Sequence, residues 1–95
     1  MVYKIIYTEE AEKDLDAIYQ FLHTAYKSEE TARNTIKMIV TAIDKLDTFP
    51  DGRSSYRLDP RYKAIYPGSY QVIFDIDDDR QAVTIVRILP SIYVH

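Results

Sequence analysis

Apolar residues recur every three or four positions through the first half of the chain, the spacing of one face of an α-helix. The first stripe consists of Ala11, Leu15, Ile18, Leu22 and Ala25 or Tyr26. The second stripe consists of Ala32, Ile36, Ile39, Ile43 and Leu46. Thr8 and Ser28 precede the two stripes and are followed by glutamates, as is typical of helix N-caps. The pattern predicts two helices that form an antiparallel hairpin and end before Phe49-Pro50.

Period-two alternation marks the strands. In residues 70–76, one predicted face carries Tyr70, Val72, Phe74 and Ile76, and the other carries Gln71, Ile73 and Asp75. Shorter strands are predicted for residues 3–7, 62–66 and 82–89. The intervening segments 67–69 and 77–81 are short enough for hairpins. The last strand is apolar on both faces, which predicts a central place in the sheet.

The resulting order is β-α-α-β-β-β within one domain over residues 1–95. We expect an α+β fold in which the antiparallel helical hairpin packs on one face of a twisted antiparallel sheet of four strands. The other face, partly concave because sheets twist, is the expected place for a binding site.

Composition agrees with an ordinary folded domain that needs no cofactor: 46% of residues are hydrophobic and 28% are charged. Cysteine is absent, which excludes disulfides and thiolate metal sites. No apolar run approaches the roughly 20 residues of a membrane span, and the first residues do not resemble a secretory signal. We therefore expect a cytoplasmic protein without a membrane partner.

The net charge of −3 hides a local excess of cations. Between residues 51 and 74 the basic side chains are Arg53, Arg57, Arg61 and Lys63. Only Asp51 and Asp59 oppose them. This segment is either a surface for phosphates or an acidic protein partner, or a solvated basic loop.

Four sequence motifs occur in a specific order and spacing. They are TEEAEKDLDAIYQFL at 8–22, LDTFPDGR at 46–53, GSYQVIFDID at 68–77 and AVTIVRIL at 82–89. In these motifs and in the order of its predicted elements, the chain resembles the RelE/ParE superfamily of bacterial toxins from type II toxin-antitoxin modules. The resemblance covers nearly all 95 residues.

The resemblance implies a toxin that a cognate antitoxin from the same operon holds inactive, and that meets operator DNA only through this antitoxin. RelE-like members cleave mRNA in the ribosomal A site, which is the expected mechanism. ParE-like members poison DNA gyrase, which is the alternative. A further alternative is a toxin fold without activity that only binds its antitoxin and co-represses the operon.

An mRNA-cleaving member must stabilise the charge on a pentacovalent phosphorus and move a proton from the ribose 2′-OH. Under this reading the catalytic candidates are Arg57, Arg61, Arg87, Tyr93 and His95. The candidates for substrate binding are Arg53, Lys63, Tyr70 and Gln71.

Three positions in the last two strands bear on this reading. Arg87 lies in an otherwise apolar strand, so we expect it to have either an internal carboxylate or a phosphate partner. Many mRNA-cleaving relatives carry an arginine where this chain has Gln71, and a histidine or another polar residue where it has Pro90. Glutamine cannot neutralise a phosphate, and proline supplies neither a proton nor a backbone donor.

Overall fold

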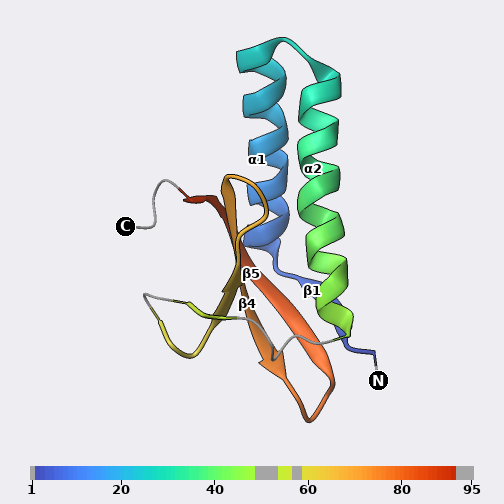
Figure 1. Cartoon of the computed structure of the whole chain (residues 1–95), viewed down its shortest axis with the longest axis vertical. Helices are drawn as coiled ribbons and strands as arrows, with labels where there is room; N and C mark the ends of the chain where they lie inside the picture. Colours follow the sequence, from blue (N-terminus) through green and yellow to red (C-terminus); the bar gives the residue numbers. More distant parts are fainter. Residues whose placement is uncertain (1, 49–53, 57–58, 92–95) are drawn as a thin grey trace.

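The structure is a computed structural model that describes residues 2–48, 54–56 and 59–91 (Figure 1). Along the sequence, two helices separate the first strand from the other strands, and all the strands belong to one sheet. In chain order the elements are β1 (Lys4–Tyr7), α1 (Glu9–Tyr26), α2 (Glu29–Asp44), the 3-10 helix η1 (Lys45–Asp47), β2 (Ser54–Ser55), β3 (Lys63–Ile65), β4 (Tyr70–Asp77) and β5 (Ala82–Pro90). The α+β fold class and the order of the predicted elements are thus confirmed.

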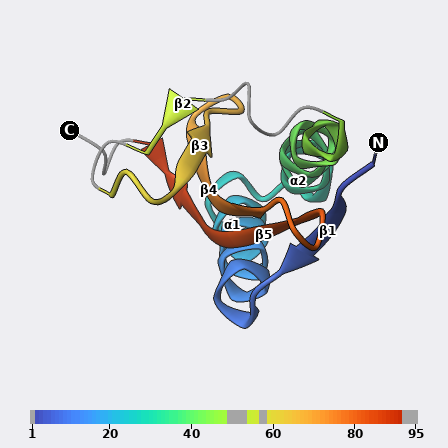
Figure 2. The same ribbon diagram turned by 90° about the horizontal axis from the view of Figure 1, so that it is seen from below.

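The sheet has five strands in the order β1-β5-β4-β3-β2, with β1 and β2 at opposite edges (Figure 2). Antiparallel pairing joins β2 to β3, β3 to β4 and β4 to β5. The predicted central position of β5 is confirmed, because this strand lies between β1 and β4.

The sheet differs from the prediction in being mixed, because β1 pairs with β5 in parallel. Strand β4 runs antiparallel to both β3 and β5, so β1, β3 and β5 share one direction. Strand β2 runs in the opposite direction, because it pairs with β3 antiparallel. The two-residue strand β2 is an addition to the four predicted strands.

The helix boundaries follow from the predicted caps. The side chain of Thr8 accepts a hydrogen bond from the backbone N–H of Ala11 at 3.1 Å, and Ser28 accepts one from Thr31 at 3.1 Å. Lys27 ends α1 with a left-handed backbone at φ 50°, which reverses the chain into α2. Neither helix in the described part of the chain combines the length and the apolar character that crossing a membrane requires.

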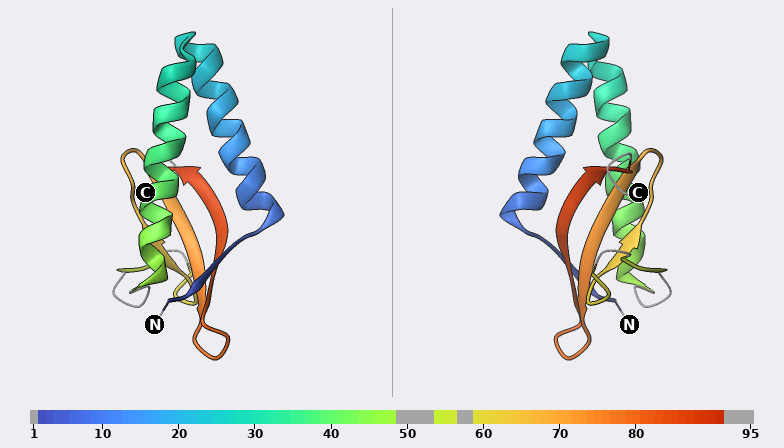
Figure 3. Two further views of the ribbon diagram at one scale, coloured as in Figure 1. Left: turned by 90° about the vertical axis from the view of Figure 1, so that its right-hand side faces the viewer. Right: turned by 90° about the vertical axis from the view of Figure 1, so that its left-hand side faces the viewer.

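The core lies between the helical hairpin and one face of the sheet. It is formed mainly by the predicted stripes together with the helix-facing positions of β4 and β5. The junction of α1 and α2 extends past the end of the sheet (Figure 3). The buried part of the first stripe therefore ends at Leu22, and Ala25 and Tyr26 are exposed.

Candidate functional site

Four of the predicted site residues, Arg53, Arg57, Tyr93 and His95, lie outside the described residues, and their roles stay predictions. The structure places the other candidates on β3, β4 and β5 and in the turn before β3. The sheet has a helix-facing side, which includes Val72 and Phe74, and an opposite side, here called the far face, which includes Gln71 and Ile73.

Arg87 has an internal carboxylate partner. Its guanidinium donates from Nε to Asp14 Oδ2 at 2.7 Å and from Nη2 to Asp14 Oδ1 at 3.0 Å. The hydrogen bonds to Asp14 raise the pKa of Arg87, so the guanidinium keeps its positive charge. Of the two partners that the sequence allows for this arginine, the structure therefore contains the carboxylate.

Asp14 also closes an open edge of the sheet. Strand β1 pairs with β5 only as far as Ile85, so the following residues of β5 have no neighbouring strand on that side. Asp14 Oδ2 accepts a hydrogen bond from the backbone N–H of Ile88 at 2.9 Å. One carboxylate of α1 thus satisfies both a backbone donor and a guanidinium of β5.

Thr8 forms hydrogen bonds with the same edge of β5, just before the residues that Asp14 contacts. Its hydroxyl donates to the backbone carbonyls of Ile85 and Val86, each at 3.0 Å, while its oxygen caps α1. Val86 is the residue at which the pairing of β4 with β5 shifts, because Ile73 lies opposite Arg87 and Phe74 opposite Ile85. This bulge lies next to the end of β1, and the hydrogen bonds of Thr8 connect the two.

The sequence contained a signal for Asp14 that the prediction did not use. Asp14 lies three positions after Ala11 and four before Ile18, so it shares the apolar stripe of α1. A carboxylate on a buried stripe requires a partner. That partner is 73 positions away in the sequence, which explains why local patterns do not identify it.

Arg61 is neutralised within its own turn. It donates from Nε and Nη2 to the carboxylate of Asp59, with the shortest contact at 2.7 Å. These hydrogen bonds hold the pKa of Asp59 below its ordinary value. The guanidinium also lies 5.5 Å from the ring centroid of Tyr62.

Lys63 lies on the helix-facing side of the sheet, whereas cationic side chains were expected on the uncovered side, and Tyr70 lies on the helix-facing side too. Lys63 pairs with Phe74, and directly opposed residues of antiparallel strands share a face. Tyr70 packs against the core, and burial, with a smaller effect of Tyr26, raises its pKa. The tyrosine hydroxyl therefore stays protonated beside the helical hairpin.

Gln71 lies on the far face but is completely buried. Its Nε2 donates to the hydroxyl of Tyr66 at 3.4 Å, and its Oε1 has no hydrogen-bond partner among the described residues. Ile73, next along this face, is only 5% exposed. The centre of the far face is thus closed, where an open binding surface was expected.

The described candidates do not form one phosphate-binding cluster. Arg61 lies in a turn, Arg87 at the β5 edge, and Gln71 within the closed far face. Both arginines already have carboxylate partners, whereas a developing phosphate charge needs cations that are free to meet it. Among the described residues, no group of three histidine, aspartate or glutamate side chains could hold a metal ion.

Solved structures with a similar fold include toxins and toxin-antitoxin complexes. The chain is similar to a structure of the chromosomal ParDE system from P. aeruginosa, with a TM-score of 0.82 and 20% identity, covering 94% of this chain and 96% of the other. It is also similar to a chain of the RelBE2 toxin-antitoxin complex from Mycobacterium tuberculosis, with a TM-score of 0.67 and 18% identity, covering 95% and 99%. A RelE toxin mutant from E. coli in the free state gives a TM-score of 0.66 and 14% identity, covering 99% and 88%. At these identities the likeness shows the fold.

Sequence comparison gives the family. No relative is found among curated proteins. A sequence profile described as the ParE toxin of the type II toxin-antitoxin system parDE matches residues 5–91. The profile spans β1 to β5, including the edge that Thr8 and Asp14 close. The chain therefore belongs to the ParE toxin family of type II toxin-antitoxin systems.

Proposed function

We propose that this protein inhibits growth by poisoning DNA gyrase, and that a cognate antitoxin neutralises it. Cleavage of mRNA was the mechanism first expected from the sequence. The observation that carries the present proposal is the Arg87–Asp14 pair, because it commits the arginine of the last strand to α1. Membership of the ParE toxin family supports the same choice.

Two further features support a mechanism without phosphoryl chemistry. Gln71 stands where many mRNA-cleaving relatives have an arginine, and its amide is buried. Arg61 is bound to Asp59 in its own turn. A toxin that binds a protein target needs a complementary surface, and it does not need a set of unpaired cations around one phosphorus.

The antitoxin partner is part of the same proposal. The structural relatives from P. aeruginosa and M. tuberculosis are described as a ParDE system and a RelBE2 toxin-antitoxin complex. Their fold extends over more than nine tenths of this chain. We infer that this chain likewise forms a complex with a small protein encoded beside it.

Expression without the antitoxin tests the mechanism. We expect growth arrest together with induction of a DNA-damage reporter, and no codon-phased cuts in mRNA by primer extension. Co-expression of the antitoxin should restore growth. Codon-phased cuts, or normal growth at full expression of the soluble protein, would contradict the proposal.

A single substitution separates the two roles of Arg87. In Arg87→Gln the positive charge is lost, so an arginine that stabilises a phosphate would no longer act and toxicity would disappear. If Arg87 only binds Asp14, the folded variant should keep its toxicity at equal soluble protein. Asp14→Asn is the matched control, because it removes the charge of the same pair from the other side.

A further inference from the structure

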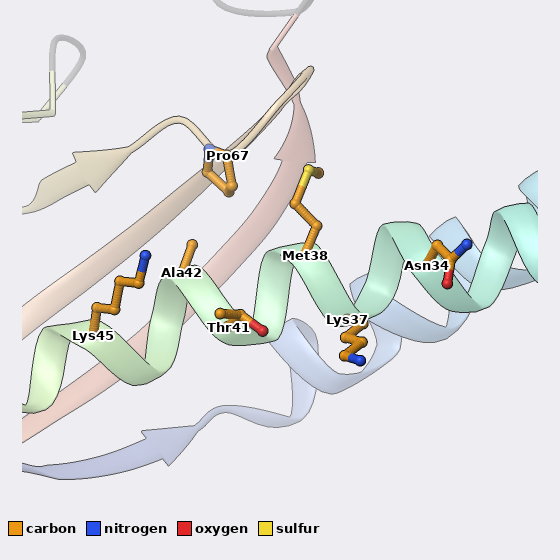
Figure 4. Close-up of a pocket in the computed structure, with 7 residues that line it drawn as sticks. All are labelled: Asn34, Lys37, Met38, Thr41, Ala42, Lys45 and Pro67. Atoms are coloured by element: carbon orange, nitrogen blue, oxygen red, sulfur yellow. The ribbon is translucent and has the colours of Figure 1, made fainter.

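The described surface has an open groove along the outer side of α2. Its volume is about 480 Å³, and Met38 and Ala42 point from α2 towards Pro67 beside it (Figure 4). The side chains that line it are mostly apolar or flexible, so they fit many kinds of occupant. The outer edge of β1 is more selective, because the backbone groups of a strand fix the direction and the register of whatever pairs with them.

Strand β1 is an edge strand, with β5 on one side and no described strand on the other (Figure 2). The backbone N–H groups of Lys4 and Thr8 donate to β5 at 2.8 and 3.1 Å, so the even-numbered residues of this segment face β5. Ile5 and Tyr7 therefore direct their N–H and C=O groups away from the sheet. No hydrogen bond between described residues uses these four groups.

The free stretch of this edge is short and is bounded at both ends. The backbone N–H of Tyr3 donates to the carbonyl of Asp47 at 2.7 Å, so η1 covers the edge before Ile5. After Tyr7 the chain leaves the sheet, because Thr8 caps α1. Only a strand whose free groups are also two residues apart can satisfy Ile5 and Tyr7 together.

Apolar surface is exposed on the same segment. Ile6 is 38% exposed and Val2 is 72% exposed. Proteins usually block an edge strand with charges, prolines or bulges. Residues 4–7 contain one lysine, no proline and no shift in their pairing with β5. This edge is therefore only weakly protected against pairing with another strand.

We propose that β1 is a dimer interface, where it pairs antiparallel with β1 of a second copy across a two-fold axis through Ile6. Ile5 then lies opposite the partner's Tyr7 and Tyr7 opposite the partner's Ile5, so four hydrogen bonds satisfy all the outward groups of both copies. An axis through Ile5 or Tyr7 would leave some groups unpaired, because Tyr3 is bound to η1 and Glu9 is helical. The inference does not depend on the target of the toxin.

The side chains of β1 match this register. Ile6 lies opposite its own copy, so each isoleucine covers exposed apolar surface of the other. Ile5 lies opposite the partner's Tyr7, and a β-branched residue with an aromatic one is a favourable cross-strand pair. Lys4 lies opposite the partner's Thr8, directly before the glutamates that begin α1, so its charge meets carboxylates. The segment is complementary to itself in backbone, apolar contact and charge, which favours a second copy as its occupant.

Cysteine cross-linking tests the register, because the chain contains no cysteine. In purified chain freed of its antitoxin, Ile6→Cys places two thiols at a pair whose Cα atoms are about 4.5 Å apart, within the range of a disulfide. We expect a disulfide-linked dimer with oxidised glutathione. The control is Lys4→Cys at an exposed position of the same face. Its two copies are displaced by about 13 Å along the strands, so it should stay unlinked.

A charge variant tests the association itself. Ile6→Lys places two ammonium groups opposite each other, so we expect the dissociation constant from sedimentation equilibrium to rise at least about tenfold. The control Val2→Lys makes the same change at an exposed position outside the paired stretch and should stay within about twofold. If Ile6→Lys does not fold, hydrogen exchange of the wild type decides. The amides of Ile5 and Tyr7 should exchange more slowly as the protein concentration rises.

Four results would overturn the inference. The first is a wild-type chain that stays monomeric at its highest soluble concentration, and the second is cross-linking of Lys4→Cys as readily as Ile6→Cys. The third is a dimer in which the amides of Ile5 and Tyr7 stay unprotected. The fourth is protection of these amides only when the antitoxin is bound, which would mean that the edge takes a strand of the antitoxin. None of these results bears on the target of the toxin.

Discussion

Asp14 is the side chain on which the junction between α1 and β5 depends. It is 15% exposed and satisfies the guanidinium of Arg87 and the backbone N–H of Ile88. Replacing it with alanine leaves the part-buried N–H of Ile88 without a hydrogen-bond partner. The Arg87 side chain, which is 45% exposed, loses its carboxylate and is solvated by water instead.

We therefore expect Asp14→Ala to lower the free energy of unfolding by about 2 kcal/mol in urea titrations. Asp14→Asn should lower the free energy of unfolding by less than Asp14→Ala does, because the amide oxygen of asparagine still accepts one hydrogen bond. The exposed Asp16→Ala on the same helix serves as the control and should change stability by less than about 0.5 kcal/mol. Equal losses of stability in Asp14→Ala and Asp16→Ala would contradict the structural role of the Asp14 carboxylate.

The two helix caps form a natural comparison. Ser28 only caps α2 from an exposed position, whereas Thr8 caps α1 and also donates to the carbonyls of Ile85 and Val86. We expect Ser28→Ala to cost about 0.5–1 kcal/mol and Thr8→Ala about 2 kcal/mol in the same unfolding assay. A larger loss at Ser28 than at Thr8 would contradict the bridging role of the threonine.

The Asp59–Arg61 pair makes a prediction about pH. Hydrogen bonds from Arg61 lower the pKa of Asp59 in the folded protein. Since the folded pKa is depressed, any stability from this pair is present above the unfolded pKa of about 3.9 and is lost as pH falls through the folded value. An NMR titration of the Asp59 carboxyl should have its midpoint below about 3.9 and return towards it in Arg61→Gln. A midpoint at or above 3.9 in the wild type would contradict the contact.

At the scale of elements, local sequence patterns predict the two helices, but they do not predict how the edges of the sheet are paired. The stripes and caps of α1 and α2 are set by neighbours three and four residues apart, so sequence reveals them. The parallel pairing of β1, the two-residue β2 and the bulge at Val86 depend on partners distant in the chain. No local spacing encodes them.

The candidate site was less predictable for the same reason. Arg87 was identified as a residue needing a partner, but the choice between carboxylate and phosphate depended on a helix 73 residues away. Lys63, as a cation, was expected on the uncovered side of the sheet, yet its register with Phe74 of β4 places it beside the helices. A strand's periodicity shows which residues share a face, and it does not show which face the hairpin covers.

The turn between β3 and β4 offers a test at this scale. Gly68→Ala places a side chain at a φ of +59°, so we expect a loss of about 1 kcal/mol in the free energy of unfolding. The added Cβ would lie 2.7 Å from the Cε of Met38, but that atom is the end of a flexible side chain that is 40% exposed and can move aside. The loss should therefore be nearly the same in a Met38→Ala background, which a double-mutant cycle measures. A much smaller loss in the Met38→Ala background would mean that Met38 cannot move.

At the scale of the whole molecule, the fold separates two surfaces. The β5 edge is closed by Asp14, and the centre of the far face is closed by the burial of Gln71 and Ile73. The outer side of α2 beside Pro67 is open, and neither Lys37 nor Lys45 there forms an ion pair with another described residue.

The central claim is tested most directly with purified protein freed of its antitoxin. It is added in parallel to gyrase with supercoiled DNA and to ribosomes translating a defined mRNA. We predict stabilised gyrase–DNA cleavage complexes and an intact message, both in the wild type and in Arg87→Gln. Cleavage of the mRNA in the ribosomal A site, lost in Arg87→Gln while gyrase is unaffected, would contradict the account.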